Sequence, residues 1–143
     1  MIKSTPKPNG FGKVCKNEIL MIQAYRYVTN SIGWEIPAGL IDPDETIIDA
    51  GKREVFEETG YETTDLELFY TYHPMNGISN QTFNIVRGRA LTRTGEFGIN
   101  EVKSVAWHSP DTVRQMIADN VIKDGFTLTA LLLHLLQREN ILE

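Results

Sequence analysis

The stretch that most constrains the fold runs from Gly39 to Tyr61 and reads GLIDPDETIIDAGKREVFEETGY. No proline lies between Thr46 and Thr59, and apolar residues recur there at helical spacing. This pattern predicts a helix of about 14 residues, preceded by a loop from Gly39 to Asp44. Gly60 suits the position just past the helix end, where a left-handed residue is usually needed.

Acidic residues gather on one face of this predicted helix. On a wheel of about 100° per residue, Glu54, Glu57 and Glu58 share one arc, and Glu54 lies one turn before Glu58. Like charges at this spacing destabilise a bare helix, and a bound cation would remove that cost. Arg53 lies one turn before Glu57 and can pair with it. Because most acidic helix faces are simply solvated, the carboxylates alone do not establish a metal site.

Stacked carboxylate oxygens suit a hard cation such as Mg²⁺ or Mn²⁺. Mg²⁺ keeps several waters and prefers one or two carboxylates plus substrate phosphates, which points to a phosphate ester or anhydride as substrate. A cation at this face would neutralise phosphate oxygens and acidify a water for attack.

Bulk composition limits the functional classes. The 143 residues predict a single domain over residues 1–143. The formal charge of −5 argues against a nucleic-acid-binding surface, although divalent ions can screen an acidic pocket for a small anionic substrate. The lone Cys15 excludes an internal disulfide, the polar N-terminus is unlike a signal peptide, and no apolar run approaches the roughly 20 residues of a membrane span. We therefore expect a cytoplasmic protein with no membrane or nucleic-acid partner.

The remaining segments predict a mixed α/β (or α+β) architecture. Residues 1–10 are expected to form a loose N-terminal segment and Thr29–Gly33 a turn. Apolar or alternating runs predict strands at Phe11–Cys15, Ile19–Tyr27, Asp65–Tyr72, Gln81–Leu91 and Glu101–Trp107. Helices are expected from a Ser109 cap to about Asp119, and over Thr127–Gln137. This order suggests a mixed sheet with helices on both faces.

The spacing within the central stretch is itself informative. It reads Gly, five residues, Glu, seven residues, Arg-Glu, an apolar residue, one residue, Glu-Glu, one residue, Gly, and an aromatic residue. This pattern resembles, without a mismatch, the Nudix box of the Nudix hydrolases. These enzymes cleave nucleoside diphosphates linked to another moiety and use Mg²⁺ or Mn²⁺. The resemblance implies an α/β/α sandwich on a mixed sheet, with the box as a loop–helix–loop.

The resemblance also assigns roles to the box residues. It implies that Glu54 and Glu58 are the main metal ligands and that Glu57 is a further ligand or the base. The supporting positions are Arg53, which orients the acidic cluster, Glu45, the auxiliary glutamate, and the structural glycines Gly39 and Gly60.

Outside the box, QAYRY, WEIPAGLID and a proline shortly beyond the box resemble the ADP-ribose pyrophosphatase branch. In that branch the carbonyl of Ala38 can bind metal and Arg26 contacts substrate, while Glu35 and Pro74 match positions near the substrate. The implied reaction is hydrolysis of ADP-ribose to AMP and ribose 5-phosphate. Another nucleotide sugar such as GDP-mannose, a non-standard nucleoside triphosphate, or a non-catalytic nucleotide-sensing module are the alternatives.

Two features depart from that branch. Many members carry an acid in the loop after the proline, whereas this chain has Ser79-Asn80-Gln81, and an amide cannot take a proton. The base is therefore expected among Glu57, Glu96 and Glu101. The branch also often uses an extra N-terminal strand region for dimerisation. This chain begins almost at the core strand, so a homodimer, if one forms, is expected to differ.

Overall fold

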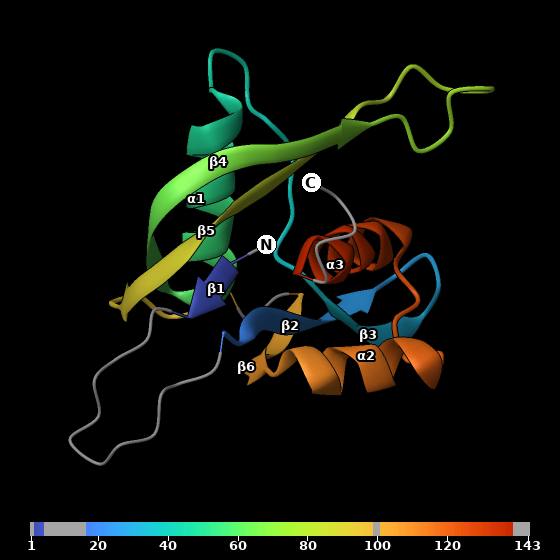
Figure 1. Ribbon diagram of the computed structural model, residues 1–143. Helices are drawn as coiled ribbons and strands as arrows, with labels where there is room; N and C mark the ends of the chain where they lie inside the picture. Colours follow the sequence, from blue (N-terminus) through green and yellow to red (C-terminus); the bar gives the residue numbers. More distant parts are fainter. Residues whose placement is uncertain (1, 5–16, 99–100, 139–143) are drawn as a thin grey trace.

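The computed structural model describes residues 2–4, 17–98 and 101–138 of the chain (Figure 1). The described residues form helices and strands in the following order: β1 (Ile2–Ser4), β2 (Ile19–Arg26), β3 (Ser31–Glu35), α1 (Ile47–Thr59), β4 (Tyr61–Tyr72), β5 (Phe83–Arg93), β6 (Val102–His108), α2 (Pro110–Ala118) and α3 (Gly125–Arg138).

The strands form one mixed sheet. Their hydrogen-bonded order is β3-β2-β1-β5-β4, and β6 pairs with β2. Residues 22–24 of β2 pair with both β3 and β6, so these two strands lie on opposite edges of β2. The pairing of β1 with β5 is parallel, whereas β2 runs antiparallel to its neighbours and β4 antiparallel to β5. The predicted mixed sheet is therefore confirmed.

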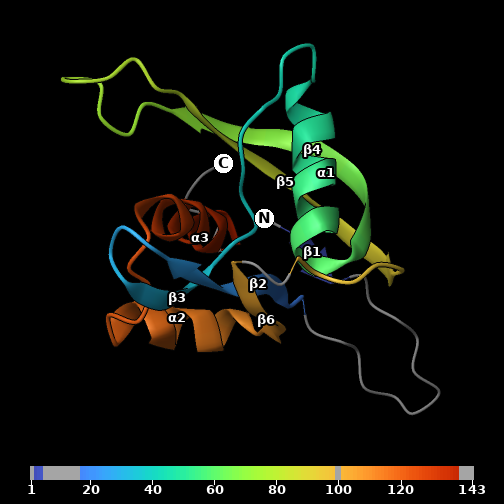
Figure 2. The same ribbon diagram turned by 180° about the vertical axis from the view of Figure 1, so that it is seen from behind.

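Strand β2 is buried on both faces of the sheet. Met21 packs in one cluster with Val113 of α2 and Leu131 of α3. Leu20, which points to the other face, packs with Val55 of α1. Each such side chain contributes about 1.5–3 kcal/mol when fully buried. The two views place α1 against β4 and β5, and α2 and α3 beside β2, β3 and β6 (Figures 1 and 2). This arrangement is the expected α/β/α sandwich.

Both ends of α1 follow from the sequence. At its start, the Thr46 hydroxyl accepts a hydrogen bond from the Asp49 amide at 3.1 Å, which satisfies one free N–H of the first turn. At its end, Gly60 adopts a left-handed conformation with φ of 74°, and its N–H donates to the Phe56 carbonyl at 2.8 Å. The predicted helix is confirmed almost to the residue.

The two C-terminal helices are also confirmed. The Ser109 hydroxyl accepts from the Thr112 amide at 3.1 Å and caps α2. Asp124 Oδ2 accepts from the Thr127 amide at 2.7 Å, and α3 begins at Gly125 rather than at Thr127. A short polar residue before the first turn is a strong start signal, which explains the earlier beginning.

Several strand predictions were wrong in their bounds. Residues 2–4, expected to be loose, form β1 because their backbone pairs with β2 and β5. Ser31–Gly33, expected to be part of a turn, begin β3, since the turn closes earlier with the Asn30 amide donating to the Tyr27 carbonyl at 3.1 Å. The strand expected at Phe11–Cys15 lies outside the described residues.

The β4–β5 hairpin is longer than the alternation indicates. β4 begins at Tyr61, directly after the helix cap, because Thr63 and Thr64 find backbone partners in Ala90 and Arg89. The hairpin extends beyond the body of the molecule (Figure 1). No helix in the described part of the chain is long and apolar enough to cross a membrane.

Replacing Gly60 tests the helix end. A Cβ at this position would overlap the carbonyl oxygen of Gly95, and a left-handed backbone costs other residues about 1–2 kcal/mol. We predict that Gly60→Ala lowers the melting temperature by roughly 5 °C or more in a circular-dichroism melt. Gly125→Ala is the control, because nothing lies within 4 Å of a Cβ there. Equal melting temperatures for the two variants would contradict this account.

Candidate active site

Glu58 lies where α1 meets the segment that follows β3. Its Oε2 accepts a hydrogen bond from the Ala38 amide at 3.0 Å. Burial, with a further contribution from the neighbouring charge of Glu54, raises the pKa of Glu58 to about 7, although the Ala38 hydrogen bond opposes this rise. A cation at this position would stabilise the charged carboxylate that burial disfavours.

Arg53 joins the loop before α1 to the acidic helix face. Its Nε and Nη2 donate to the two oxygens of Glu45, each at 2.9 Å, and Nη2 also donates to the Leu40 carbonyl at 2.8 Å. Its Nη1 donates to Glu54 at 2.6 Å and to Glu57 at 3.3 Å. A planar guanidinium presents several donors in a fixed fork, so one side chain can hold the loop and orient two acids. This agrees with the orienting role predicted for Arg53.

The segment between β3 and α1 passes close to Glu54. A Cβ at Gly39 would overlap the Glu54 carboxylate in its present position, so glycine lets the segment pass this close without a shift of that side chain. The Ile36 amide donates to the hydroxyl of Thr127 at 3.1 Å, which ties the segment to α3. The segment after β3 therefore lies between α1, which carries Glu54, and α3, which carries Thr127.

Arg26, Glu35 and Glu101 form an ion-pair network at the end of β2. The Arg26 guanidinium binds both oxygens of Glu35, with Nε at 3.0 and 3.1 Å, and its Nη1 lies 3.2 Å from Glu101 Oε2. Glu35 is only 6% exposed, so this pair compensates the cost of its burial. The hydrogen bond to Glu35 is the main cause that raises the pKa of Arg26, and the charge of Glu58 also contributes. Arg26 therefore interacts electrostatically with Glu58 on the acidic helix face.

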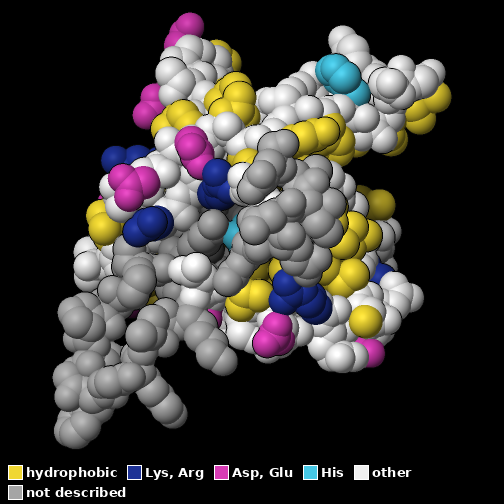
Figure 3. Space-filling model, viewed as in Figure 1, with side chains coloured by type: hydrophobic (Ala, Val, Ile, Leu, Met, Phe, Trp, Pro, Cys, Tyr) yellow, Lys and Arg dark blue, Asp and Glu magenta, His cyan; other side chains and the backbone are white. Residues whose placement is uncertain are grey.

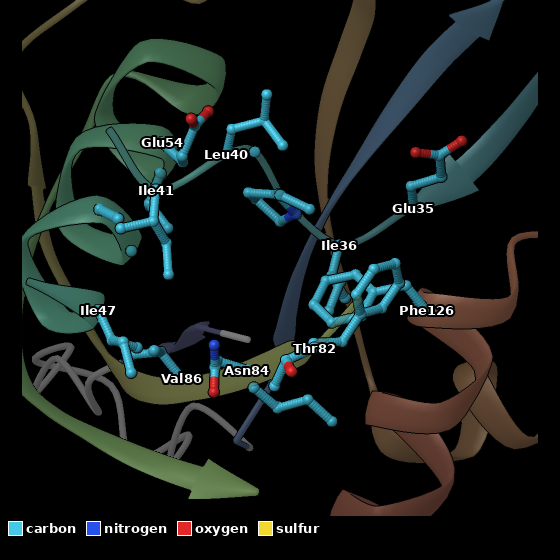
Figure 4. Close-up of a pocket in the computed structure, with 18 of the residues that line it drawn as sticks. Glu35, Ile36, Leu40, Ile41, Ile47, Glu54, Thr82, Asn84, Val86 and Phe126 are labelled. Atoms are coloured by element: carbon cyan, nitrogen blue, oxygen red, sulfur yellow. The ribbon is translucent and has the colours of Figure 1, made fainter. Parts of the chain in front are cut away.

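A cavity of about 650 Å³ lies beside these groups (Figure 4). This volume falls within the range of small-molecule sites. Among the described residues, the charged ones in its wall are Arg26, Glu35, Glu54 and Asp124. The apolar part of the wall includes Ile36, Leu40, Ile41, Ile47, Val86 and Phe126. The cavity therefore has polar groups at defined points on a largely apolar surface.

A divalent cation at the acidic helix face would need oxygen ligands from the side chains and backbone around it. The described residues contain no group of three or more His, Cys, Asp or Glu side chains that could hold a metal by themselves. They do contain two interacting carboxylates, Glu54 and Glu58, against the backbone of Ala38 and Gly39. Mg²⁺ takes one or two carboxylates and completes its shell with water and substrate phosphate, so this set fits Mg²⁺ or Mn²⁺.

The structure brings most of the predicted site residues together. The cavity wall includes Arg26, Glu35, Ala38, Gly39 and Glu54. Glu58 reaches the same segment through Ala38, and Glu101 is connected to it through Arg26.

Two predicted residues lie elsewhere. Pro74 follows β4 in the β4–β5 hairpin and is not part of the cavity wall. This hairpin projects from the surface of the molecule (Figure 3). Glu96 is exposed in the loop after β5, near the end of α1, where the Gly98 amide donates to the Glu57 carbonyl at 3.0 Å. Their proposed roles stay predictions.

The sequence reasoning missed the contribution of β5 and α3 to the cavity. Thr82, Asn84 and Phe126 all line it. The strand and the helix were predicted, but the face that each residue presents depends on how α1 packs against the sheet. Gly51 allows this packing to be close, since a Cβ there would lie 3.3 Å from Val86. Alternation along β5 is the signal that could have found Asn84, once the register was known.

Comparison with known proteins agrees with this geometry. A family model described as the NUDIX domain matches residues 12–128. A "CMP-5'-(N-acetyl-N-hydroxy-3-aminopropyl)phosphonate hydrolase" of Streptomyces rubellomurinus is 37% identical over 116 residues, which cover 80% of this chain and 54% of that relative. The chain spans about half or less of the length of the curated relatives of this kind.

Solved structures show the same fold. A crystal structure of an ADP compounds hydrolase superposes with a TM-score of 0.75 at 20% identity, over 99% of this chain and 74% of that chain. A NUDIX hydrolase from Nitrosomonas europaea superposes with a TM-score of 0.63 at 25% identity, over 82% of this chain and 79% of that chain.

The raised pKa of Glu58 predicts a pH-dependent stability of the metal-free protein. Because the folded carboxyl holds its proton up to a pH of about 7, stability is highest below the unfolded pKa near 4.5 and falls as the pH rises to about 7. The loss is of the order of 3 kcal/mol, measured by urea unfolding between pH 4.5 and 8. A Mg²⁺ ion held by Glu58 would have to displace this proton, so Mg²⁺ affinity should rise over the same interval. In Glu58→Gln, the unfolding free energy and the Mg²⁺ affinity should both change less with pH. An unchanged pH dependence would rule out Glu58 as the group responsible.

Proposed function

This chain belongs to the NUDIX domain family, and on that premise we propose that it is a divalent-metal-dependent hydrolase of a nucleoside diphosphate linked to another moiety. The observation that carries the proposal is the contact of Glu58 with the Ala38 amide, beside Glu54 and at the edge of the cavity. Two carboxylates then lie beside the cavity, which supports contact between them and a ligand bound there. All the acids of the box are present, which favours catalysis over a non-catalytic nucleotide-sensing module.

The contacts of the residues support the following roles. Glu54 and Glu58 would hold the cation, and the Ala38 carbonyl is a further candidate ligand. A bound Mg²⁺ or Mn²⁺ would offset the charge of the phosphate oxygens and acidify a water for attack. Arg53 holds Glu54 at 2.6 Å and fixes its direction relative to Gly39.

The preferred substrate is ADP-ribose, cleaved to AMP and ribose 5-phosphate. Arg26 and Glu35 lie in the cavity wall beyond the acidic face, where a second polar half of a substrate can reach them. A nucleotide sugar has a diphosphate in the middle and a polar group at each end, which suits this arrangement. The Streptomyces rubellomurinus relative is named for a nucleotide joined to a further group, which also supports this substrate class.

The metal-binding role of the two carboxylates predicts a large loss of activity. Replacing Glu54 or Glu58 with Gln preserves shape and removes charge. We expect the rate to fall about a hundredfold or more, which corresponds to about 2.7 kcal/mol of transition-state stabilisation. The measurement is release of AMP and ribose 5-phosphate at saturating Mg²⁺, with Glu62→Gln on β4 as the control. Retained turnover in Glu58→Gln would reject this assignment.

The general base is proposed among Glu57, Glu96 and Glu101. Glu57 and Glu101 are paired with arginines and have side chains 57% and 69% exposed, so both can reach a water. Loss of a general base typically costs 10²–10⁴-fold in rate, so one of the three Gln variants should lose this much together with the acidic limb of its pH profile. If all three keep the wild-type rate and limb, the protein supplies no base from this set.

Substrate preference is tested by a screen over nucleotide sugars, dinucleotides and nucleoside triphosphates. We expect ADP-ribose to give a higher kcat/KM than any triphosphate. Arg26→Lys should mainly raise KM, because it keeps a charge near Glu35 but loses the guanidinium fork. A triphosphate that is hydrolysed better than every nucleotide sugar would refute the substrate and leave the hydrolase proposal standing.

A further inference from the structure

Asn84 presents its amide to the cavity in a fixed orientation. Thr71 and Asn84 are directly opposite each other in the β4–β5 ladder. The Thr71 hydroxyl donates to Asn84 Oδ1 at 2.9 Å. Asn84 belongs to the cavity wall, and its amide nitrogen points towards the interior of the cavity while its oxygen points away (Figure 4).

This hydrogen bond decides what Asn84 can offer to a ligand. A free asparagine side chain presents one acceptor and two N–H donors. Because Oδ1 is bound to Thr71 and points away from the cavity, the part of the side chain that faces the cavity is its N–H donors. It therefore suits an acceptor atom, such as a ring nitrogen or a carbonyl oxygen, and it opposes an amino group.

Two aromatic rings line the same cavity as this donor. Phe126 and Phe83 meet edge to face with ring centroids 5.1 Å apart, and both line the cavity. Aromatic faces bind flat rings, and such contacts tolerate different bases. A flat, apolar ring with an acceptor on its edge uses both features, whereas a sugar uses only the donor.

Asn84 also lies away from the acidic end of the cavity. Figure 4 shows Glu54 on one side of the cavity and Asn84, Thr82 and Phe126 on the other. A ligand whose phosphates lie at the acidic end would extend its remaining part towards Asn84.

We propose that this end of the cavity binds the nucleobase of the substrate, and that Asn84, oriented by Thr71, selects bases by donating to one acceptor on the base edge. The inference rests on the proposed hydrolysis of a nucleoside diphosphate derivative for its substrate class. An asparagine that makes two hydrogen bonds to adenine needs both the donor and the acceptor of its amide. Oδ1 of Asn84 is bound to Thr71 and points away from the cavity, so Asn84 reads a single atom of the base.

The experiment is equilibrium binding of AMP, GMP, CMP, UMP and ribose 5-phosphate, measured by calorimetry without turnover. Asn84→Asp replaces the donor with a charged acceptor, and we expect it to weaken the tightest-binding mononucleotide by roughly tenfold or more. Binding of ribose 5-phosphate, which has no base, should change less than twofold or so. Asn76→Asp, an exposed position in the same hairpin, adds the same charge and should leave all five affinities unchanged.

Thr71→Val is the second variant and keeps the size of the side chain. It frees Oδ1, so the amide can turn and present its acceptor. We expect the differences in affinity among the four mononucleotides to shrink, with the fold intact. The proposal is overturned if Asn84→Asp and Thr71→Val both bind the four mononucleotides as the wild type does, or if the wild type binds none of them better than ribose 5-phosphate. Because no hydrolysis is measured, failure of the proposed reaction would not alter these results.

Discussion

The fork of hydrogen bonds made by Arg53 holds the site together. It connects Glu45 and the Leu40 carbonyl in the loop with Glu54 on the helix, so the loop cannot move without the helix. The same guanidinium offsets part of the repulsion that three acids create on one helix face. The position of the Ala38–Gly39 backbone relative to the carboxylates follows from this connection, because the Glu54 carboxylate lies against Gly39. A substitution that kept the charge but lost the fork would therefore disturb both the loop and the acids.

The charges of the cavity limit how this acidic protein would bind the anionic substrate proposed for it. Arg26 is the cation among the described wall residues, and it is already engaged by Glu35 and Glu101. Its charge serves first to allow the burial of Glu35. For the proposed diphosphate substrate, the balancing charge would then come from a cation at Glu54 and Glu58. The burial that makes Glu58 costly to ionise in the metal-free protein is what makes a cation there effective, since Coulomb attraction is stronger in a less polar environment.

The sequence predicts local structure well and tertiary pairing poorly. Helix α1 was predicted because apolar residues recur at helical spacing and Gly60 suits the left-handed position just past its end. Strand β1 was missed because three residues owe their extended form to partners on β2 and β5. The box residues were found because their spacing on one helix sets their positions. Asn84 and Thr127 were missed because their roles depend on which side of a strand or helix faces the segment after β3.

The parallel pairing of β1 with β5 has a consequence for the order of folding. Ile2–Ser4 pair with Gly88–Ala90, and in the hydrogen-bonded order β1 lies between β2 and β5. During synthesis, β1 cannot pair with β5 until residues 88–90 have been made, which is more than half of the chain. Contacts between residues distant in sequence form slowly, because the entropy cost of closing a long loop comes before these contacts can stabilise the chain. The hairpin of β2 and β3 and the helix α1 can form from local contacts at once, so the last event is expected to be the joining of the two halves of the sheet through β1.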